Sequence, residues 1–117
     1  MKESSIVASI IREVKKAYPR IYIRKISDRF TRGMPDILMI VPYLKKVWTG
    51  NMRNGFLEYQ DHEYSIALLV ECKTVKGKTS KLQEIELQLI RNSGAKAILA
   101  TDAEAVIKTL EDIRAIK

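Results

Sequence analysis

Two acidic residues interrupt apolar runs of the chain that are typical of buried strands. Asp36 opens the run at residues 36–42, and Glu71 lies near the end of the run at residues 66–73. A carboxylate is costly inside a sheet unless it is paired or bound to a metal. Because side chains alternate along a strand, Glu71 and Lys73 share one face, and Cys72 points to the other. If Asp36 lies beside them, two carboxylates converge on a site suited to a hard divalent cation such as Mg²⁺.

Such a site is suited to the hydrolysis of a phosphodiester. A bound cation would polarise the phosphate and lower the pKa of a bound water. Lys73 could orient that water or stabilise the developing negative charge. The alternative is that Asp36 is a turn residue and that Glu71 and Lys73 are strand-end charges in solvent. Their joint presence on apolar strands of a basic chain favours the site.

The patterning predicts one α/β domain over residues 1–117, with the element order α-β-β-β-α-β-α. The predicted helices cover residues 3–18, ended by Pro19, residues 80–93, with Gly94 at the C-cap position, and a last segment opened by a capping box at Thr101 and Glu104. The predicted strands cover residues 20–27, 36–42, 66–73 and 95–100. Residues 43–65 predict an additional hairpin, with two short strands on either side of a turn at residues 50–55.

Two of the predicted helices carry polar residues close to their apolar stripes. Glu3 falls near the middle of the first stripe and Glu13 at its edge. The first stripe consists of Ile6, Val7, Ile10, Ile11, Val14 and Ala17. A carboxylate centred on a buried face indicates a functional role for Glu3, with Glu13 in reserve, although the helix dipole also favours an anion in the first turn. Gln83 lies beside the stripe of the second helix and, taken alone, is typical of a surface glutamine. The second stripe consists of Leu82, Ile85, Leu89 and Ile90.

The formal net charge of +7 favours a polyanionic partner. Six basic residues lie in or beside the segments that flank the proposed site, where they would contact phosphates or serve solubility alone: Lys25, Arg29, Arg32, Lys76, Lys78 and Lys81. Residues 43–65 mix basic and aromatic side chains, namely Lys45, Lys46, Trp48, Arg53, Phe56 and Tyr59. Such a mixture can stack on unpaired bases or form a dimer interface, and we favour the interface.

Several other classes of protein are disfavoured. Cys72 is the one cysteine, so the chain forms no internal disulfide, which fits a reducing compartment. The sequence has neither the apolar core of a signal peptide nor a run long enough for a membrane helix, so we expect a soluble, cytoplasmic protein. His62 is the one histidine, too few for a zinc site, and no glycine-rich motif predicts a nucleotide cofactor.

The order of Gly33-Met34-Pro35-Asp36, then Glu71-Cys72-Lys73, then a helix with Gln83 resembles the VRR-NUC branch of the PD-(D/E)XK nucleases. The resemblance runs from Glu3 through Ala97. It implies a restriction-endonuclease-like α-β-β-β-α-β core with a mixed central sheet, a Mg²⁺ or Mn²⁺ cofactor, and cleavage of DNA to leave a 5′-phosphate. It also implies that Asp36 and Glu71 are metal ligands, that Lys73 is catalytic and that Gln83 supports the site. In the resulting hypothesis, the backbone carbonyl of Cys72 is a third ligand, and Glu3 adds a direct or water-mediated contact.

The chain departs from the small phage and bacterial members of that branch in residues 43–65, which are longer by a hairpin. By analogy with the family, we expect a homodimer that selects branched or junction DNA. The size of the domain suits a phage-encoded protein acting in the host cytoplasm. Two other functions remain open: a non-catalytic DNA-binding module on the same fold, and an interaction subunit that delivers a replication or repair partner.

Overall fold

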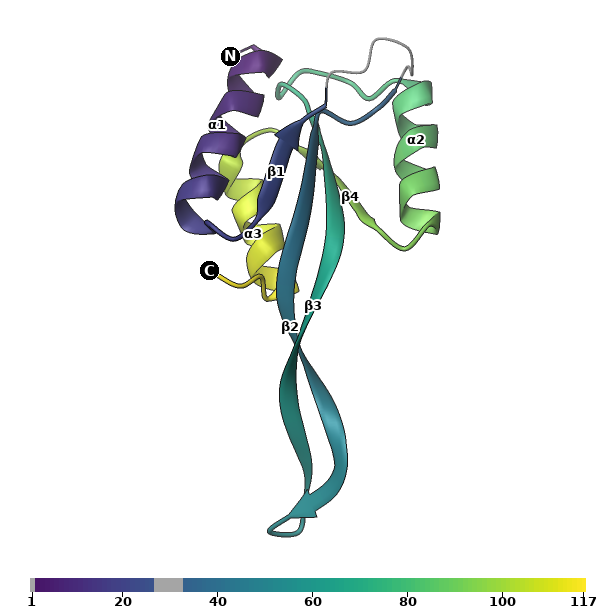
Figure 1. The fold of residues 1–117 in the computed structure, drawn as a ribbon. Coiled ribbons are helices and arrows are strands. Elements are labelled where there is room, and N and C mark those ends of the chain that lie inside the picture. The colour runs from purple at the N-terminus through teal and green to yellow at the C-terminus, as the bar shows by residue number, and fades with distance from the viewer. Residues whose placement is uncertain (1, 27–32) are drawn as a thin grey trace.

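The computed structural model describes residues 2–26 and 33–117, and within these ranges the chain forms three helices and one four-stranded sheet (Figure 1). The elements are α1 Glu3–Ala17, β1 Tyr22–Lys25, β2 Ile37–Arg53, β3 Phe56–Cys72, α2 Lys81–Asn92, β4 Lys96–Ala100 and α3 Ala103–Ile113. The strand order is β1-β2-β3-β4, in which β1, β2 and β3 pair antiparallel and β4 lies parallel to β3. This mixed sheet flanked by helices confirms the predicted restriction-endonuclease-like α/β fold.

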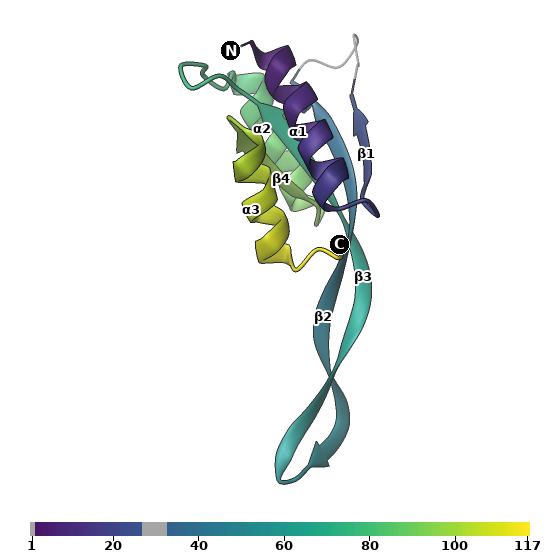
Figure 2. The same ribbon diagram turned by 90° about the vertical axis from the view of Figure 1, so that its left-hand side faces the viewer.

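The hydrophobic core lies on one face of the sheet, where α1 and α3 cover it, and α2 lies on the other side (Figures 1 and 2). Alternation along β2 and β3 sends Met39 and its partner Leu68 to the core face. Buried residues from the two helices complete the core: Ile6, Val7, Ile10 and Val14 from α1, and Val106 and Leu110 from α3. The apolar stripe predicted for the first helix is therefore confirmed. This core anchors the ends of β2 and β3 at which Asp36 and Glu71 lie.

The buried face of α2 differs from the prediction. Leu87 is the buried residue of this helix, whereas Leu82, Ile85 and Leu89 of the predicted stripe are about half exposed. The helix packs mainly against β4, at the edge of the sheet. Only a narrow strip of its surface is covered there, so the broad stripe expected from helical spacing remains largely in solvent.

The hairpin at residues 43–65 is not the separate pair of short strands that the sequence predicts. Instead, β2 and β3 are each 17 residues long and continue past the core as one twisted ribbon (Figure 1). Their pairing is regular from Ile37 opposite Val70 to Trp48 opposite Tyr59, and the register shifts only between Trp48 and Met52. Gly50, the first residue of the predicted turn, therefore lies within an irregularity of the ribbon. The turn itself narrows to Asn54-Gly55, with φ of 52° and 80°, as a two-residue hairpin turn requires.

Two helix ends further test the sequence-based prediction. Gly94 follows the C-cap of α2 with φ of 92°, as predicted for a glycine at that position. The predicted start of the last helix is wrong by one residue, because the N-cap is Asp102 and not Thr101. The Asp102 carboxylate accepts the Ala105 N–H at 2.9 Å, which satisfies one of the free donors of the first turn.

Candidate active centre at the ends of strands β2 and β3

Asp36 is held in place by three hydrogen bonds at the start of β2. Its main-chain N–H donates to the Val70 carbonyl at 2.9 Å, and its carbonyl accepts the Ile26 N–H at 2.8 Å. Its Oδ2 accepts the Cys72 N–H at 2.7 Å. The carboxylate is therefore fixed directly against the end of β3, beside the residue that precedes Lys73. The two segments predicted to bring Asp36 and Glu71 together do so.

Glu71 is the one buried charged residue of the described part of the chain, with 3% of its surface exposed. Its Oε1 accepts the Gln83 Nε2–H at 2.9 Å. Its Oε2 is buried and has no hydrogen-bond partner among the described residues. The pKa of Glu71 is raised to about 7, mainly by burial and next by the negative charge of Asp36, whose effect is larger than the opposing effect of Lys73. A second positive charge, in addition to Lys73, would offset the cost of burying an ionised Glu71 next to Asp36.

Lys73 forms ion pairs that link the end of β3 to the start of α1. Its Nζ lies 3.7 Å from Glu71 Oε1 and 3.5 Å from Glu3 Oε1, and 15% of its side chain is exposed. Glu3 is half exposed, so it lies at the rim of the centre and not in the core as its place on the helix suggested. The reserve candidate, Glu13, instead pairs with Arg12 at 3.3 Å. It is about 15 Å further along the helix, at 1.5 Å per residue.

Gln83 both caps the start of α2 and forms a hydrogen bond to Glu71. Its Oε1 accepts the Ser80 N–H at 2.9 Å while the Ser80 hydroxyl accepts the Gln83 N–H at 3.1 Å, which forms a capping box. This arrangement directs the amide nitrogen to Glu71. Helical spacing alone predicts a surface glutamine here. The spacing Ser-x-x-Gln is a capping signal that could have fixed the orientation of this side chain from sequence.

The backbone of Gly33 touches the first turn of α2. Its φ is +86°, and a Cβ at this position would lie 2.7 Å from the Leu82 carbonyl oxygen. Only glycine fits both the conformation and the space. Gly33 therefore sets the distance between the segment leading to Asp36 and the helix that carries Gln83.

We expect Gly33→Ala to lower the free energy of unfolding by roughly 2–3 kcal/mol, from backbone strain and the clash with α2 together. Gly50→Ala is the matched control, because its φ is +89° and a Cβ there would have nothing within 4 Å. It carries the backbone strain without the clash. Urea unfolding of both variants checks the difference. Equal destabilisation would contradict a specific contact between Gly33 and α2.

Four of the six basic residues that were predicted to contact phosphate lie in the described part of the chain, on the segments next to this centre. Lys76 and Lys78 are exposed in the loop between β3 and α2, and Lys81 is exposed at the start of α2. Lys25 is exposed at the end of β1, where it pairs with Ile37, the residue after Asp36. Arg29 and Arg32 lie outside the described residues.

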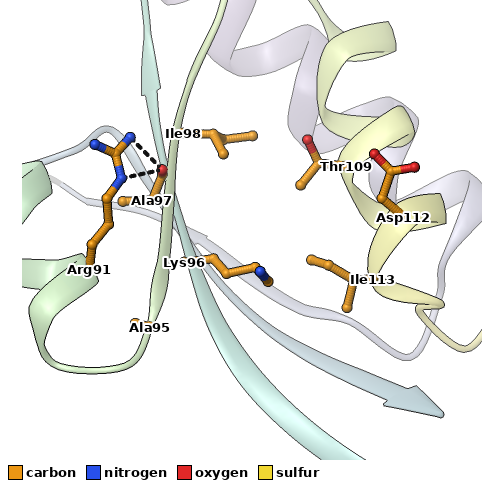
Figure 3. A pocket seen from close by; sticks show the side chains of 8 residues that line it. All are labelled: Arg91, Ala95, Lys96, Ala97, Ile98, Thr109, Asp112 and Ile113. Atoms are coloured by element: carbon orange, nitrogen blue, oxygen red, sulfur yellow. Dashed lines mark hydrogen bonds between the residues drawn. The ribbon is translucent and has the colours of Figure 1, made fainter. Parts of the chain in front are cut away.

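A cavity of about 490 Å³ is lined by Ile6 of α1, by Thr101 and by the three residues that follow Lys73 in the chain, Thr74, Val75 and Lys76. A second cavity, of about 460 Å³, lies between β4 and α3 and contains none of the predicted site residues (Figure 3). At its border, the Arg91 guanidinium donates to the Ala97 carbonyl at 2.8 and 3.1 Å. Because β4 is an edge strand, this pair covers a main-chain acceptor that could otherwise bind an added strand.

The two carboxylates of Asp36 and Glu71 suit Mg²⁺, which keeps water ligands, better than a cation whose ligands are all side chains. Within residues 2–26 and 33–117, no group of three His, Cys, Asp or Glu side chains is arranged to hold a metal. Mg²⁺ commonly takes one or two carboxylates and keeps several waters. Asp36 and the unpartnered Oε2 of Glu71 meet that requirement. The thiol of Cys72 is not a competing ligand, since burial raises its pKa to about 12.

The mixed sheet, with two acidic residues and a lysine at the ends of its central strands, has the organisation of a PD-(D/E)XK-type nuclease domain. The VRR-NUC domain model matches residues 1–103, and the chain belongs to the VRR-NUC family. It is therefore a nuclease-like domain that acts on DNA. No curated protein and no solved structure matches the chain. None of the helices that the structure describes is long and apolar enough to span a membrane.

Proposed function

We propose that the protein is a Mg²⁺- or Mn²⁺-dependent endodeoxyribonuclease whose centre is formed by Asp36, Glu71 and Lys73. The observation that carries this proposal is Glu71, a buried carboxylate with one unpartnered oxygen and a pKa raised to about 7, next to Asp36. A structural ion pair would satisfy both of its oxygens. A bound cation would account for the remaining oxygen, Oε2 of Glu71, which has no hydrogen-bond partner.

Each residue of the centre has a role that follows from its position. Asp36 and Glu71 would hold the cation, with the Cys72 carbonyl as a third ligand and Glu3 in contact directly or through a water. When bound, the cation supplies polarisation of the phosphate and a more acidic water. Lys73, held between Glu3 and Glu71, can donate to a phosphate oxygen or orient the attacking water. Gln83 fixes Oε1 of Glu71 and leaves Oε2 for the cation.

For the substrate, we propose branched or junction DNA, cut by a homodimer to leave a 5′-phosphate. The exposed lysines near the centre support binding to a phosphate backbone and not to particular bases. The test is cleavage of labelled four-way junction, flap, single-stranded and linear duplex DNA with Mg²⁺ or Mn²⁺. The proposal requires cleavage of a branched substrate by the wild type and none by Lys73→Ala. Tight binding without cleavage in either metal would support the non-catalytic module instead.

Lys76 and Lys78 are expected to contribute to DNA affinity without setting its selectivity. The double variant Lys76→Ala/Lys78→Ala should weaken binding to every substrate and reduce the slope of log K against log[salt] by about 2, since each phosphate contact contributes about 0.9. Lys15→Ala/Lys16→Ala removes the same charge from the last turn of α1, at the opposite end of that helix from Glu3. Fluorescence anisotropy at several salt concentrations compares the two. An equal loss of slope in both would contradict local contacts at Lys76 and Lys78.

A further inference from the structure

The ribbon formed by β2 and β3 ends in an arm, defined here as residues 47–60, that projects away from the body of the protein (Figures 1 and 2). The last ion pairs that tie the ribbon to the body come before it, from Asp61 to Arg114 at 3.5 Å and from Glu63 to Arg20 at 2.8 Å. From the turn to Cys72, β3 spans about 50 Å at 3.3 Å per residue. The arm is therefore far from the active centre of its own chain.

One face of the arm is apolar and open to solvent. Trp48 pairs with Tyr59, and Met52 pairs with Leu57. Because Leu57 and Tyr59 are two residues apart on β3, all four side chains point to the same face. They are 52%, 51%, 64% and 52% exposed in the order Trp48, Tyr59, Met52 and Leu57. We call this set the arm face.

The opposite face of the arm is mostly polar. It carries a hydrogen bond from the Thr49 hydroxyl to Glu58 at 3.0 Å, together with Arg53 and its partner Phe56. An alternation of apolar and polar side chains is typical of a sheet with one covered face. A two-stranded hairpin by itself is at best marginally stable in water. The part of the chain that the structure describes places nothing over the arm face, so any cover for it would have to come from another molecule.

The arm face can be buried without leaving the indole nitrogen of Trp48 unsatisfied. Trp48 Nε1 donates to the Asn51 carbonyl at 3.1 Å within the arm itself. A buried donor without a partner would cost about 1–3 kcal/mol. The arm therefore has the hydrogen bonding of a surface that can enter an apolar interface.

Charge indicates what covers the arm face. Arg53 and Glu58 are the charged residues of the arm and cancel, so the net charge of +7 resides in the rest of the chain. DNA binding depends on several cations per site, and the arm offers one. Two copies of so basic a chain repel each other least when they meet through a surface without net charge, and the arm is such a surface. Under a two-fold axis, an identical apolar face on each copy is its own complement.

We propose that the arm is the self-association element of the protein, with the arm face of one copy packed on the arm face of a second. Two such layers pack about 10 Å apart. The four half-exposed side chains offer on the order of 400 Å² per copy, or about 800 Å² for the pair. Stable interfaces begin near 1,200 Å², so polar flanking residues complete the contact and the dimer dissociates in the micromolar range. This inference names the interface of the homodimer proposed above and rests on that part of the proposed function.

The sole tryptophan of the chain, Trp48, lies in this interface and reports on it directly. Sedimentation equilibrium of the full chain from about 1 to 200 μM is expected to show a monomer–dimer equilibrium. Over the same range, the Trp48 emission should shift to the blue and acrylamide quenching should fall at least twofold. Raising the salt concentration should strengthen the dimer, because it screens the repulsion between the two bodies.

Leu57→Ser should weaken dimerisation at least tenfold. Phe56→Ser is the matched control, since Phe56 is 76% exposed and lies on the opposite face. It should leave the dimer unchanged. A Trp48 emission that does not change up to 200 μM would overturn the proposal, and so would a dimer that Leu57→Ser leaves intact. Trp48 quenching by added DNA in a protein that remains monomeric would also overturn it. Cleavage by a monomeric protein would overturn the arm and homodimer proposals while leaving the nuclease proposal in place.

Discussion

Replacement of Asp36 by asparagine is expected to lower the single-turnover rate of DNA cleavage by about 10³-fold or more. Loss of a metal ligand removes several kcal/mol of transition-state stabilisation, and each 1.4 kcal/mol corresponds to a factor of ten. The fold should survive, because an asparagine oxygen can still accept the Cys72 N–H that Asp36 accepts at 2.7 Å. The variant thus separates the charge of Asp36 from its structural hydrogen bond.

Asp112→Asn provides the control for this experiment, because Asp112 is exposed on α3 and lines the cavity beside β4. It removes a carboxylate from the same protein without touching the centre. We expect its cleavage rate to stay within about twofold of the wild type, as for most surface substitutions. A rate for Asp36→Asn that is as high as that of the control would mean that the centre is misplaced.

Replacement of Glu71 by glutamine is expected to stabilise the metal-free protein at pH 8 and to abolish its response to metal. The pKa of Glu71 in the folded protein is raised from 4.5 to about 7. A group with a raised pKa contributes stability that is fully present below its unfolded pKa and is lost as the pH rises through its folded pKa. The wild type should therefore lose up to about 3 kcal/mol between pH 4.5 and 7.5, at 1.4 kcal/mol per pKa unit. A neutral glutamine does not titrate and keeps that stability.

Urea unfolding at pH 5 and pH 8, with and without Mg²⁺, measures both effects. The wild type should gain stability from Mg²⁺ at pH 8 and little at pH 5, where Glu71 is protonated. Glu71→Gln should gain none at either pH. Glu86→Gln, a neutral replacement elsewhere in the protein, should behave as the wild type does. If Glu71→Gln shows the same pH profile as the wild type, the titration belongs to another group.

Much of the candidate active centre could be predicted from local sequence because short-range geometry determines the positions of its residues. Strand alternation places Glu71 and Lys73 on one face whatever the rest of the fold. The pairing of β2 with β3 then brings Asp36 to Cys72. Gln83 could not be placed from helical spacing, because its orientation depends on the capping box with Ser80 and on the depth of Glu71.

Long-range packing explains what the sequence did not predict. The stripe on α2 is amphipathic, but the helix lies at the sheet edge, so Leu82, Ile85 and Leu89 remain half exposed. The turn at Asn54-Gly55 was recognisable, whereas continuous pairing through the irregularity at residues 48–52 was not. Strand length depends on cross-strand partners, which are known only once the register is fixed.

The arm and the centre lie at opposite ends of the same two strands. The ends of β2 and β3 that carry Asp36 and Glu71 are held by the core, while the other ends extend past the body of the protein (Figure 1). The proposed nuclease centre and the proposed dimer contact are thus separated along one ribbon. Changes in the arm should alter the oligomeric state without changing the pKa of Glu71 or the affinity for a metal.

A crystal of the protein grown with Mn²⁺ would show whether Asp36 and Glu71 together bind a divalent cation. Anomalous diffraction at the manganese edge locates the ion independently of any activity. We expect a peak at roughly 2.0–2.2 Å from an oxygen of Asp36 and from Oε2 of Glu71, a ligand distance close to that of Mg²⁺. At saturating Mn²⁺, a peak elsewhere on the protein, or no peak beside these two carboxylates, would contradict this expectation.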